Sequence, residues 1–189
     1  MSALAPHHVF SYDAYLEHEK LTGAKHEFVN GQVFAMSGGT PEHARLTFRV
    51  AAALDRMIDP ARCRVFSSDL KVRVRATGLA TYPDVAIGCG ELELDGEDAL
   101  AVVNPKVLVE VLSPSTEAYE RGEKWSHFRR IASLEAYVLV SPLPQRLECY
   151  ARTDEGSWVH RIADKGETLQ LPCLGGALAP DPLFEHAIA

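Results

Sequence analysis

Two acidic residues stand in otherwise apolar stretches of this chain. Glu110 is the one charged residue of the segment 107–112, and Asp84 directly precedes the apolar residues 85–87. A carboxylate that leaves water loses its hydration, so acids are seldom buried without a partner. A divalent cation is one such partner, because hard cations bind carboxylate oxygens. If both segments form neighbouring strands, Asp84 and Glu110 can share one metal ion.

Each acid also has an ordinary structural explanation. A Pro-Asp pair commonly closes a turn, which would account for Asp84 without any ligand. For Glu110 the ordinary explanation requires a buried lysine or arginine, and buried ion pairs add little net stability. Because both acids lie in strand-like segments, a shared metal ion explains the pair better than two separate structural roles.

Turn and cap signals predict the elements that position these acids. Asn30-Gly31 lies between the runs 27–29 and 32–34 and predicts a hairpin, because both residues tolerate positive φ. Thr40 and Pro41 predict the start of a helix, which apolar residues at helical spacing extend to about residue 58. The segment 113–116 ends the strand that carries Glu110 and caps a helix over 117–131.

The remaining segments complete a prediction of alternating helices and strands. A short helix is expected at 11–20, strands at 64–66, 70–75, 82–87 and 136–140, and a late hairpin from 147–151 and 158–162. Residues 76–81 are expected to form a turn, and the acidic segment 88–98 an exposed loop. Since no repeat or linker interrupts this order, the sequence predicts one α/β domain over residues 1–189.

The composition is that of a soluble globular protein. The chain has 189 residues, of which 47% are hydrophobic and 24% charged, enough to bury a substantial core. It has no apolar run of roughly 18 residues that would span a membrane, and no basic N-terminal region leading into an apolar stretch. The four cysteines are far apart, so we expect reduced thiols in a cytoplasmic protein rather than a zinc site or disulfides.

The charge is unevenly distributed along the chain. The net charge of −7 argues against a general affinity for nucleic acids. However, the segment 45–75 has eight basic residues and three acidic ones, whereas 84–101 has six acidic residues and no basic one. One face could therefore attract phosphate, although a solvated helix and strand would produce the same pattern.

Six short segments together resemble a known protein family. They cover residues 26–31, 41–43, 82–85, 109–116, 121–124 and 137–140. Their order and spacing are similar to those of the Uma-type family of restriction-endonuclease-like proteins, in the PD-(D/E)XK nuclease superfamily. The resemblance covers nearly the whole chain. It implies a restriction-endonuclease-like α/β core, with a mixed central β-sheet flanked by helices and with extra β-hairpins.

The resemblance also implies a set of site residues. Asp84, Glu110 and the backbone carbonyl of Val111 would bind Mg²⁺ or Mn²⁺, and Glu27 would be a further acid. The superfamily motif places a lysine two residues after the glutamate, where this chain has Leu112. The implied substitute is Lys124 on the following helix.

Other positions have alternative interpretations. Glu27 could be an ordinary hairpin acid, and Lys124 could form a surface pair with Glu120, four residues earlier. The family usually has Asp where Glu120 stands and Tyr where Phe128 stands. At the start of the long predicted helix, His43, Arg45 and Arg49 are candidates for contacts to DNA phosphates.

The resulting functional prediction is a metal-dependent endonuclease that hydrolyses DNA phosphodiester bonds. One alternative is a nuclease-fold module that binds nucleic acid or metal without turnover, suggested by Leu112 and the acidic net charge. Another is a scaffold that self-associates through the late hairpin. We expect a homodimer and no membrane partner.

Overall fold

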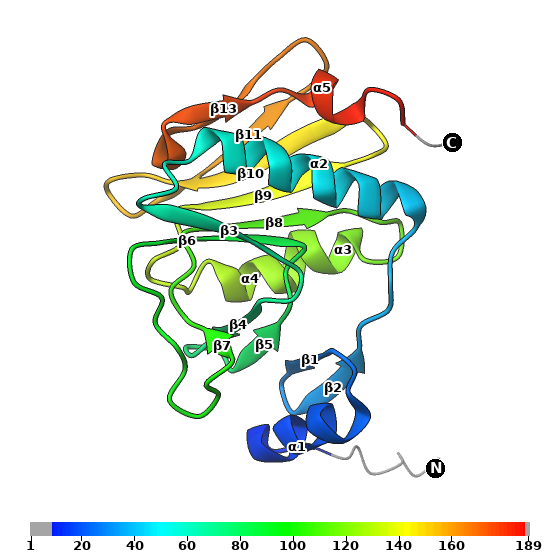
Figure 1. Ribbon diagram of the computed structural model, residues 1–189, viewed down its shortest axis with the longest axis vertical. Coiled ribbons are helices and arrows are strands. Elements are labelled where there is room, and N and C mark those ends of the chain that lie inside the picture. The colour runs from blue at the N-terminus through cyan, green and yellow to red at the C-terminus, as the bar shows by residue number, and fades with distance from the viewer. Residues whose placement is uncertain (1–8, 188–189) are drawn as a thin grey trace, which may run out of the picture.

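The computed structural model describes residues 9–187, which contain two main β-sheets (Figure 1). The larger sheet has the strand order β11-β10-β9-β8-β6-β3. Its strands are β3 (Cys63–Ser67), β6 (Val85–Cys89), β8 (Val107–Val111), β9 (Ala136–Ser141), β10 (Arg146–Arg152) and β11 (Trp158–Ala163). β8 pairs with β6 in antiparallel and with β9 in parallel orientation, so the sheet is mixed as predicted.

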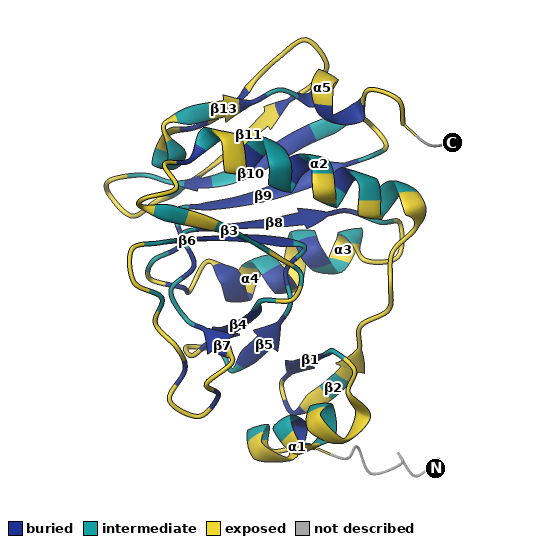
Figure 2. Ribbon diagram, viewed as in Figure 1, coloured by how far each residue is buried: buried dark blue, intermediate teal, exposed yellow. Residues whose placement is uncertain are grey.

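The two central strands are apolar because both of their faces are covered. On one face, helix α2 (Pro41–Met57) packs Leu46, Val50 and Leu54 against a cluster that includes Val109. On the other face, Leu108 belongs to a separate cluster with residues of the smaller sheet and of the helical crossover. Figure 2 shows β8 and β9 as buried strands between these layers. The alternation along β8 therefore directs Glu110 to the crossover side.

The crossover between β8 and β9 is a helix interrupted by a wider turn. It consists of α3 (Glu117–Tyr119), a π-helical turn (Glu120–Lys124) and α4 (Trp125–Phe128). The predicted helix over 117–131 is thus correct in place but wrong in regularity and in its end. Such π-helical turns are rare and frequently occur at functional sites.

The smaller sheet has the strand order β2-β1-β5-β4-β7. Its strands are β1 (His26–Val29), β2 (Gln32–Ala35), β4 (Lys71–Val74), β5 (Leu79–Thr81) and β7 (Ala101–Val102). The predicted β1–β2 hairpin is confirmed, with positive φ at Asn30 and Gly31. β5 falls within the segment predicted as a turn, so that prediction is wrong for 79–81.

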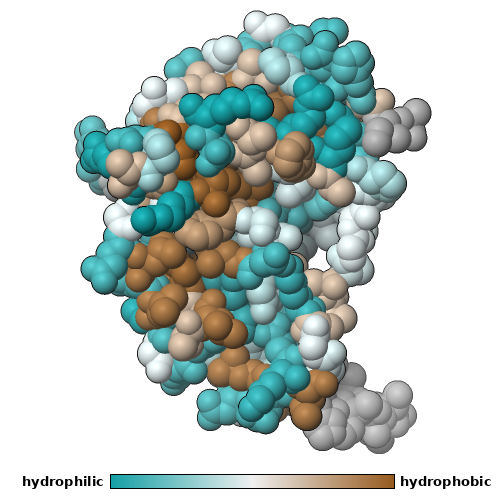
Figure 3. All heavy atoms as spheres, in the orientation of Figure 1, coloured by the Kyte–Doolittle hydropathy of each residue, from teal (hydrophilic) through white to brown (hydrophobic). Residues whose placement is uncertain are grey.

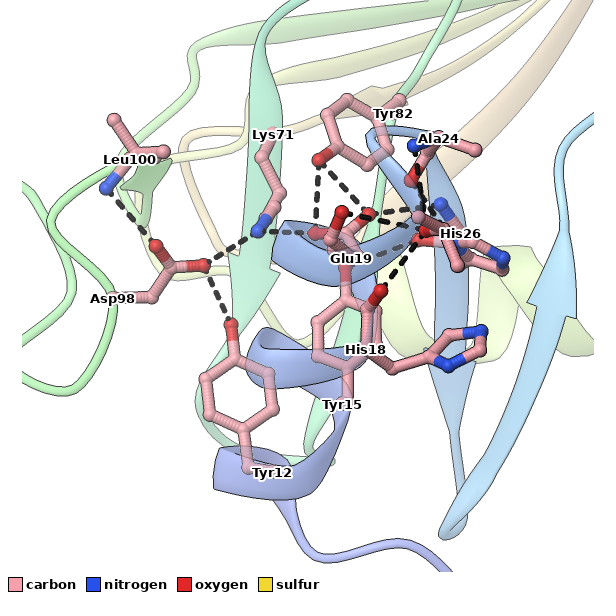
Figure 4. A network of polar contacts seen from close by, with 11 residues as sticks. Tyr12, Tyr15, His18, Glu19, Ala24, His26, Lys71, Tyr82, Asp98 and Leu100 are labelled. Carbon is pink, nitrogen blue, oxygen red and sulfur yellow. Dashed lines mark hydrogen bonds and ion pairs between the residues drawn. The ribbon is translucent and has the colours of Figure 1, made fainter.

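A buried polar network fixes helix α1 (Tyr12–Thr22) to the smaller sheet (Figure 4). The ammonium of Lys71 lies 2.7 Å from Glu19 Oε2 and 2.9 Å from Asp98 Oδ2. The hydroxyl of Tyr82 donates to both Glu19 oxygens at 3.1 Å, and that of Tyr12 donates to Asp98 at 3.0 Å. Because Tyr82 lies two residues before Asp84, this network also anchors the entry to β6.

The acidic segment after β6 is only partly an exposed loop. Asp98 is 5% exposed and pairs with Lys71, whereas Asp95 pairs with Arg75 at 2.8 Å. The expectation of a fully solvated loop is therefore wrong, because the loop folds back and β7 pairs with β4. Apolar patches remain among the charged residues on the face shown in Figure 3, and Leu94 and Leu100 of this loop are exposed.

The C-terminal segment packs beside α2. It contains β12 (Leu169–Leu171), a short 3₁₀ helix (Pro172–Leu174), β13 (Gly176–Leu178) and α5 (Pro180–Phe184). Leu169, Leu178 and Phe184 belong to the same apolar cluster as the buried side of α2. This segment therefore closes the core on the face opposite the crossover (Figure 1).

Two of the four cysteines form a disulfide. Cys63 and Cys89 are direct cross-strand partners on β3 and β6 and are bonded to each other, whereas Cys149 and Cys173 are free. The expectation of four reduced thiols is wrong because strand pairing joins cysteines that are 26 positions apart in the sequence. Among the described residues, no helix is both long and apolar enough to cross a membrane.

Candidate functional site

Asp84 and Glu110 lie next to each other at one end of the β6–β8 pair. Val85 is paired with Val109 in an antiparallel ladder, which places the residue before β6 beside Glu110. The Asp84 backbone N–H donates to Glu110 Oε2 at 3.2 Å, and the Val111 N–H donates to Asp84 Oδ2 at 2.8 Å. Glu110 is 2% exposed. The two acids are therefore brought together, and their binding of a metal stays a prediction.

Lys124 reaches these acids from the crossover. Its ammonium lies 2.6 Å from Glu110 Oε1 and 3.9 Å from Glu27 Oε2, and the residue is 4% exposed. The alternative of a surface pair with Glu120 is thus wrong. Burial by itself would lower the pKa of the Lys124 ammonium, but the carboxylates of Glu110 and Glu27 outweigh burial and raise that pKa.

Glu27 is a buried member of the same cluster. It lies on β1 and is 8% exposed, in contrast to an ordinary hairpin acid. Thr81 donates its hydroxyl to Glu27 Oε2 at 2.6 Å, and Tyr119 donates to Glu27 Oε1. No sequence pattern indicated Thr81 or Tyr119, because strand pairing and crossover packing alone bring them to Glu27. Together they hold the Glu27 carboxylate toward Lys124.

His43 reaches the acids from the first turn of α2. The side chain of Thr40 caps this helix by accepting the His43 backbone N–H at 3.2 Å. His43 Nε2 lies 3.1 Å from Asp84 Oδ2. The hydrogen bond to Asp84 raises the pKa of His43 despite the opposing effect of burial, and the Val111 backbone adds to the rise. The structure thus places His43 within the acid cluster, on the α2 side of the sheet.

Glu120 is a cluster member that the sequence analysis did not assign to the site. It lies in the π-helical turn, is 6% exposed, and its Oε2 atom has no hydrogen-bond partner among the described residues. Burial raises the pKa of Glu120, and the charges of Lys124, Asp84 and His43 also act on it. Its position four residues before Lys124 places both side chains on one side of a helix. The same spacing is typical of a surface ion pair, so it did not indicate a site residue.

The cluster has more acidic than basic groups. Its acids are Glu27, Asp84, Glu110 and Glu120, and its bases are Lys124 and His43. These four acids outnumber the two bases even when His43 is protonated. Burial raises the pKa of Glu110, and the charges of Asp84 and Glu120 raise it further, against the effect of Lys124. A bound divalent cation would offset the negative charge of these acids.

The donor set suits a hard cation that keeps part of its water shell. Within residues 9–187, no three His, Cys, Asp or Glu side chains converge into a ready metal site. Two carboxylates and the Val111 carbonyl are sufficient for Mg²⁺, which is usually bound through one or two carboxylates and keeps several waters. The residues present therefore fit a Mg²⁺ or Mn²⁺ ion.

The structure does not bring Arg45 and Arg49 to the acids. Arg45 pairs with Glu42 at 2.6 Å and donates to the backbone carbonyl of Glu185. Arg49 donates to the carbonyls of Pro182 and Glu185. Arg45 and Arg49 are four residues apart and share one side of α2, which contacts the C-terminal segment. His43 is two residues before Arg45, so it points in another direction and contacts Asp84. We therefore leave Arg45 and Arg49 out of the proposed site.

Three of the six other bases in the segment 45–75 are also engaged. Lys71 and Arg75 form ion pairs, and Arg73 donates to a backbone carbonyl. Arg62 and Arg64, which have no such partner in the described part of the chain, line an open hollow of about 700 Å³ together with Lys106. This hollow includes Cys63 and Cys89 and lies at the opposite end of β6 from Asp84.

Comparisons with known proteins agree with this architecture. The model of the Uma2 family, described as "Putative restriction endonuclease", matches residues 12–180. An uncharacterized protein of Synechocystis sp. is 33% identical over 183 residues, which cover 97% of this chain and 95% of that protein. A second uncharacterized protein of the same organism is 28% identical over 159 residues, covering 84% and 90% of the two chains.

A solved structure shares the fold. The crystal structure of "a putative nuclease belonging to DUF820" from Anabaena variabilis matches with a TM-score of 0.75. The match covers 93% of this chain and 98% of that chain at 17% sequence identity, so it bears on the fold alone. The predicted fold class, a mixed α/β fold with helices on both sides of a central sheet and extra hairpins, is confirmed.

Proposed function

Since the chain belongs to the Uma2 family of restriction-endonuclease-like proteins, we propose that it is a metal-dependent endonuclease that hydrolyses DNA phosphodiester bonds. The observation that carries this proposal is the buried acid cluster around Asp84 and Glu110. A purely structural cluster would be expected to balance its charges, because unpaired buried charges are strongly destabilising. Here buried acids outnumber the cations that contact them.

Asp84, Glu110 and the backbone carbonyl of Val111 would hold the metal ion. A bound Mg²⁺ or Mn²⁺ would polarise a phosphoryl oxygen and lower the pKa of a bound water. Each of these carboxylates accepts a backbone hydrogen bond, Glu110 from the Asp84 N–H and Asp84 from the Val111 N–H, so the two side chains are held next to each other. The ion would have to compete with the Lys124 ammonium for Glu110 and with His43 for Asp84.

Lys124 provides the ammonium group that the motif lysine would provide, since Leu112 stands at the position of that lysine. Leu112 is 3% exposed within an apolar cluster, where an ammonium would have no partner. Lys124 instead brings its ammonium to Glu110 from the crossover. There it can stabilise negative charge that develops on a phosphate, while Glu27, 3.9 Å from the ammonium, helps to hold it in place. His43 is the second cationic candidate for a phosphate contact.

A plasmid-nicking assay tests the proposal. The wild-type protein should nick DNA with Mn²⁺ or Mg²⁺ and lose this activity in EDTA. Asp84→Asn and Glu110→Gln should abolish nicking, whereas Glu123→Gln should retain it, since Glu123 is an exposed acid of the same π-helical turn. Nicking by Glu110→Gln at the wild-type rate would refute the proposal. Binding of DNA and metal by a wild-type protein that never cleaves would favour the alternative, a binding module without turnover.

A further inference from the structure

The Glu120 carboxylate has one of the few buried side-chain atoms of the described residues that lack a hydrogen-bond partner, and unlike Glu110 it has no ion pair among the described residues either. Buried polar atoms in native proteins almost always have a hydrogen-bond partner. Glu120 is 6% exposed, yet its Oε2 atom has no such partner within residues 9–187. An acid that is buried without a full set of donors costs stability, so its presence calls for a reason other than folding.

Nearby cations do not supply that reason. The ammonium of Lys124 lies 2.6 Å from Glu110 and 3.9 Å from Glu27, and the ring of His43 lies 3.1 Å from Asp84. Among the described residues, neither cation is within ion-pair distance of Glu120. Both cationic groups of the cluster therefore contact other acids, and Glu120 has no direct ion pair among the described residues.

Glu120 lies in the same buried region as the acids that would hold the ion. Glu120 begins the π-helical turn, and this turn buries Glu120 and Lys124 on its inner side. The charge of Glu120 acts on Glu110, and that of Asp84 acts on Glu120, so the three carboxylates share one region. They nevertheless do not converge on a single point as a three-acid metal site.

We propose that Glu120 is a positioning acid for the divalent cation, acting through water rather than as a direct ligand. This inference rests on the proposed function. Mg²⁺ and similar ions keep several waters, and these waters need acceptors in a buried site. The free Oε2 atom of Glu120 is such an acceptor, and its negative charge would offset the charge of the ion. Residues that act on a metal at one remove typically change its affinity by roughly 10- to 100-fold.

Titration of the metal-free protein with Mn²⁺, followed by calorimetry, tests this role without any DNA. Glu120→Gln should weaken Mn²⁺ binding by roughly 10-fold or more. Glu120→Asp, which keeps the charge on a shorter side chain, should bind Mn²⁺ more tightly than Glu120→Gln. The matched control is Glu123→Gln, which removes an exposed acid from the same turn and should bind like the wild type.

A second readout separates a metal role from a structural one. Without metal, Glu120→Gln should unfold at a higher temperature than the wild type, by roughly 2–4 °C, because it removes a buried carboxylate that has no direct ion pair among the described residues. Saturating Mn²⁺ should then stabilise the wild type more than the variant. A structural acid would show the reverse, with Glu120→Gln less stable before any metal is added.

The outcomes are distinguishable. If the wild type binds Mn²⁺ and Glu120→Gln binds it equally well, the role of Glu120 is refuted while the proposed function stands. A lower unfolding temperature of metal-free Glu120→Gln also refutes that role. If the wild type itself binds no Mn²⁺, both the role of Glu120 and the metal-dependent function fall.

Discussion

At the residue scale, the site depends on a few charged groups that the fold forces together. Lys124 is surrounded by carboxylates and is 4% exposed. A buried cation of this kind is required while the acids are charged, because removing one partner leaves the others buried and unpaired. Lys124 therefore has a structural role in the metal-free protein in addition to its proposed role toward phosphate.

Lys124→Met tests this double role. The variant should lose about 3–5 kcal/mol of unfolding free energy without metal, because Glu110 and Glu27 lose the ammonium between them. Mn²⁺ should restore part of this loss, since the ion supplies positive charge to the same acids. Urea unfolding with and without Mn²⁺ measures both effects, and the exposed Lys165→Met is the control. A loss below about 1 kcal/mol, the usual value of a surface pair, would contradict this account.

At the element scale, each functional side chain is presented by a local device. The N-cap Thr40 fixes the first turn of α2 and with it His43, which reaches Asp84 from one side of the sheet. The crossover between β8 and β9 brings Lys124 from the other side. The site is therefore assembled from both covers of one sheet.

Thr40→Ala tests the contribution of the cap. Loss of the hydroxyl that accepts the His43 N–H should cost about 1 kcal/mol of stability. Nicking should also weaken if His43 contacts phosphate, because its helical turn is no longer fixed. Thr40→Ser, which keeps an acceptor, should behave like the wild type in thermal unfolding and in nicking. Equal stability of the alanine and serine variants would contradict the capping role.

Glu148 of β10 ties the crossover to the late hairpin. Arg121 donates two hydrogen bonds to it at 2.7 Å, and His160 of β11 lies 3.0 Å away. Burial would raise the pKa of Glu148, but the hydrogen bonds from Arg121 and His160 outweigh burial and lower that pKa. A lowered carboxyl pKa stabilises the folded state above the unfolded pKa of about 4.3, and this stability is lost as the pH falls through the folded pKa.

Glu148→Gln should therefore destabilise the protein at pH 7 by about 1–3 kcal/mol. Below pH 4 the difference from the wild type should shrink, because the wild-type carboxylate becomes protonated and its advantage disappears. Urea unfolding from pH 3 to pH 7 provides the comparison. A difference that stays constant over this range would contradict the charge-based role of Glu148.

The sequence predicted those elements that have strong local signals. The Asn30-Gly31 hairpin, the long helix after Thr40 and the strand with Glu110 follow from turn chemistry, capping and apolar patterning. β5 and β7 have three and two residues, too few to show a periodicity. The π-helical turn also has no sequence signature, so the orientation of Glu120 could not be foreseen. The bonds of Arg45 and Arg49 to backbone carbonyls could not be predicted from their charge, and their contact with DNA phosphates stays a prediction.

At the scale of the whole molecule, the pairing of strands that are distant in the sequence determines which cysteines are cross-linked. The disulfide joins β3 to β6 because these strands align Cys63 with Cys89. Near this end, Arg62 and Arg64 line the hollow. β11 is an edge strand of the larger sheet and is therefore available to pair with a second copy of the chain. The expected homodimer stays a prediction, which gel filtration tests.

The disulfide predicts two thiols rather than four in the oxidised protein. Thiol titration under denaturing, non-reducing conditions should detect Cys149 and Cys173 alone. Cys63→Ser/Cys89→Ser should lower the unfolding free energy by about 3 kcal/mol, since the bond closes a loop of moderate length. Detection of four reactive thiols in protein purified without reductant would contradict the cross-link.

Outside the acid cluster, we expect Arg62 and Arg64 to bind DNA phosphates and so to increase the affinity of the protein for DNA. Arg62→Ala/Arg64→Ala should weaken DNA binding and reduce its salt dependence, because each phosphate contact releases counterions. Arg56→Ala is the matched control, since Arg56 is exposed and does not line the hollow. Fluorescence anisotropy at several salt concentrations measures the effect. Equal affinities of the double variant and the control would exclude the hollow from the DNA-binding surface.

The most direct test of the central claim is an anomalous difference map from crystals soaked in Mn²⁺. The account predicts one strong peak within direct ligand distance of both the Asp84 and the Glu110 carboxylates, which is lost in Glu110→Gln crystals. A map without that peak, in which the Lys124 ammonium still occupies Glu110 at saturating Mn²⁺, would contradict it.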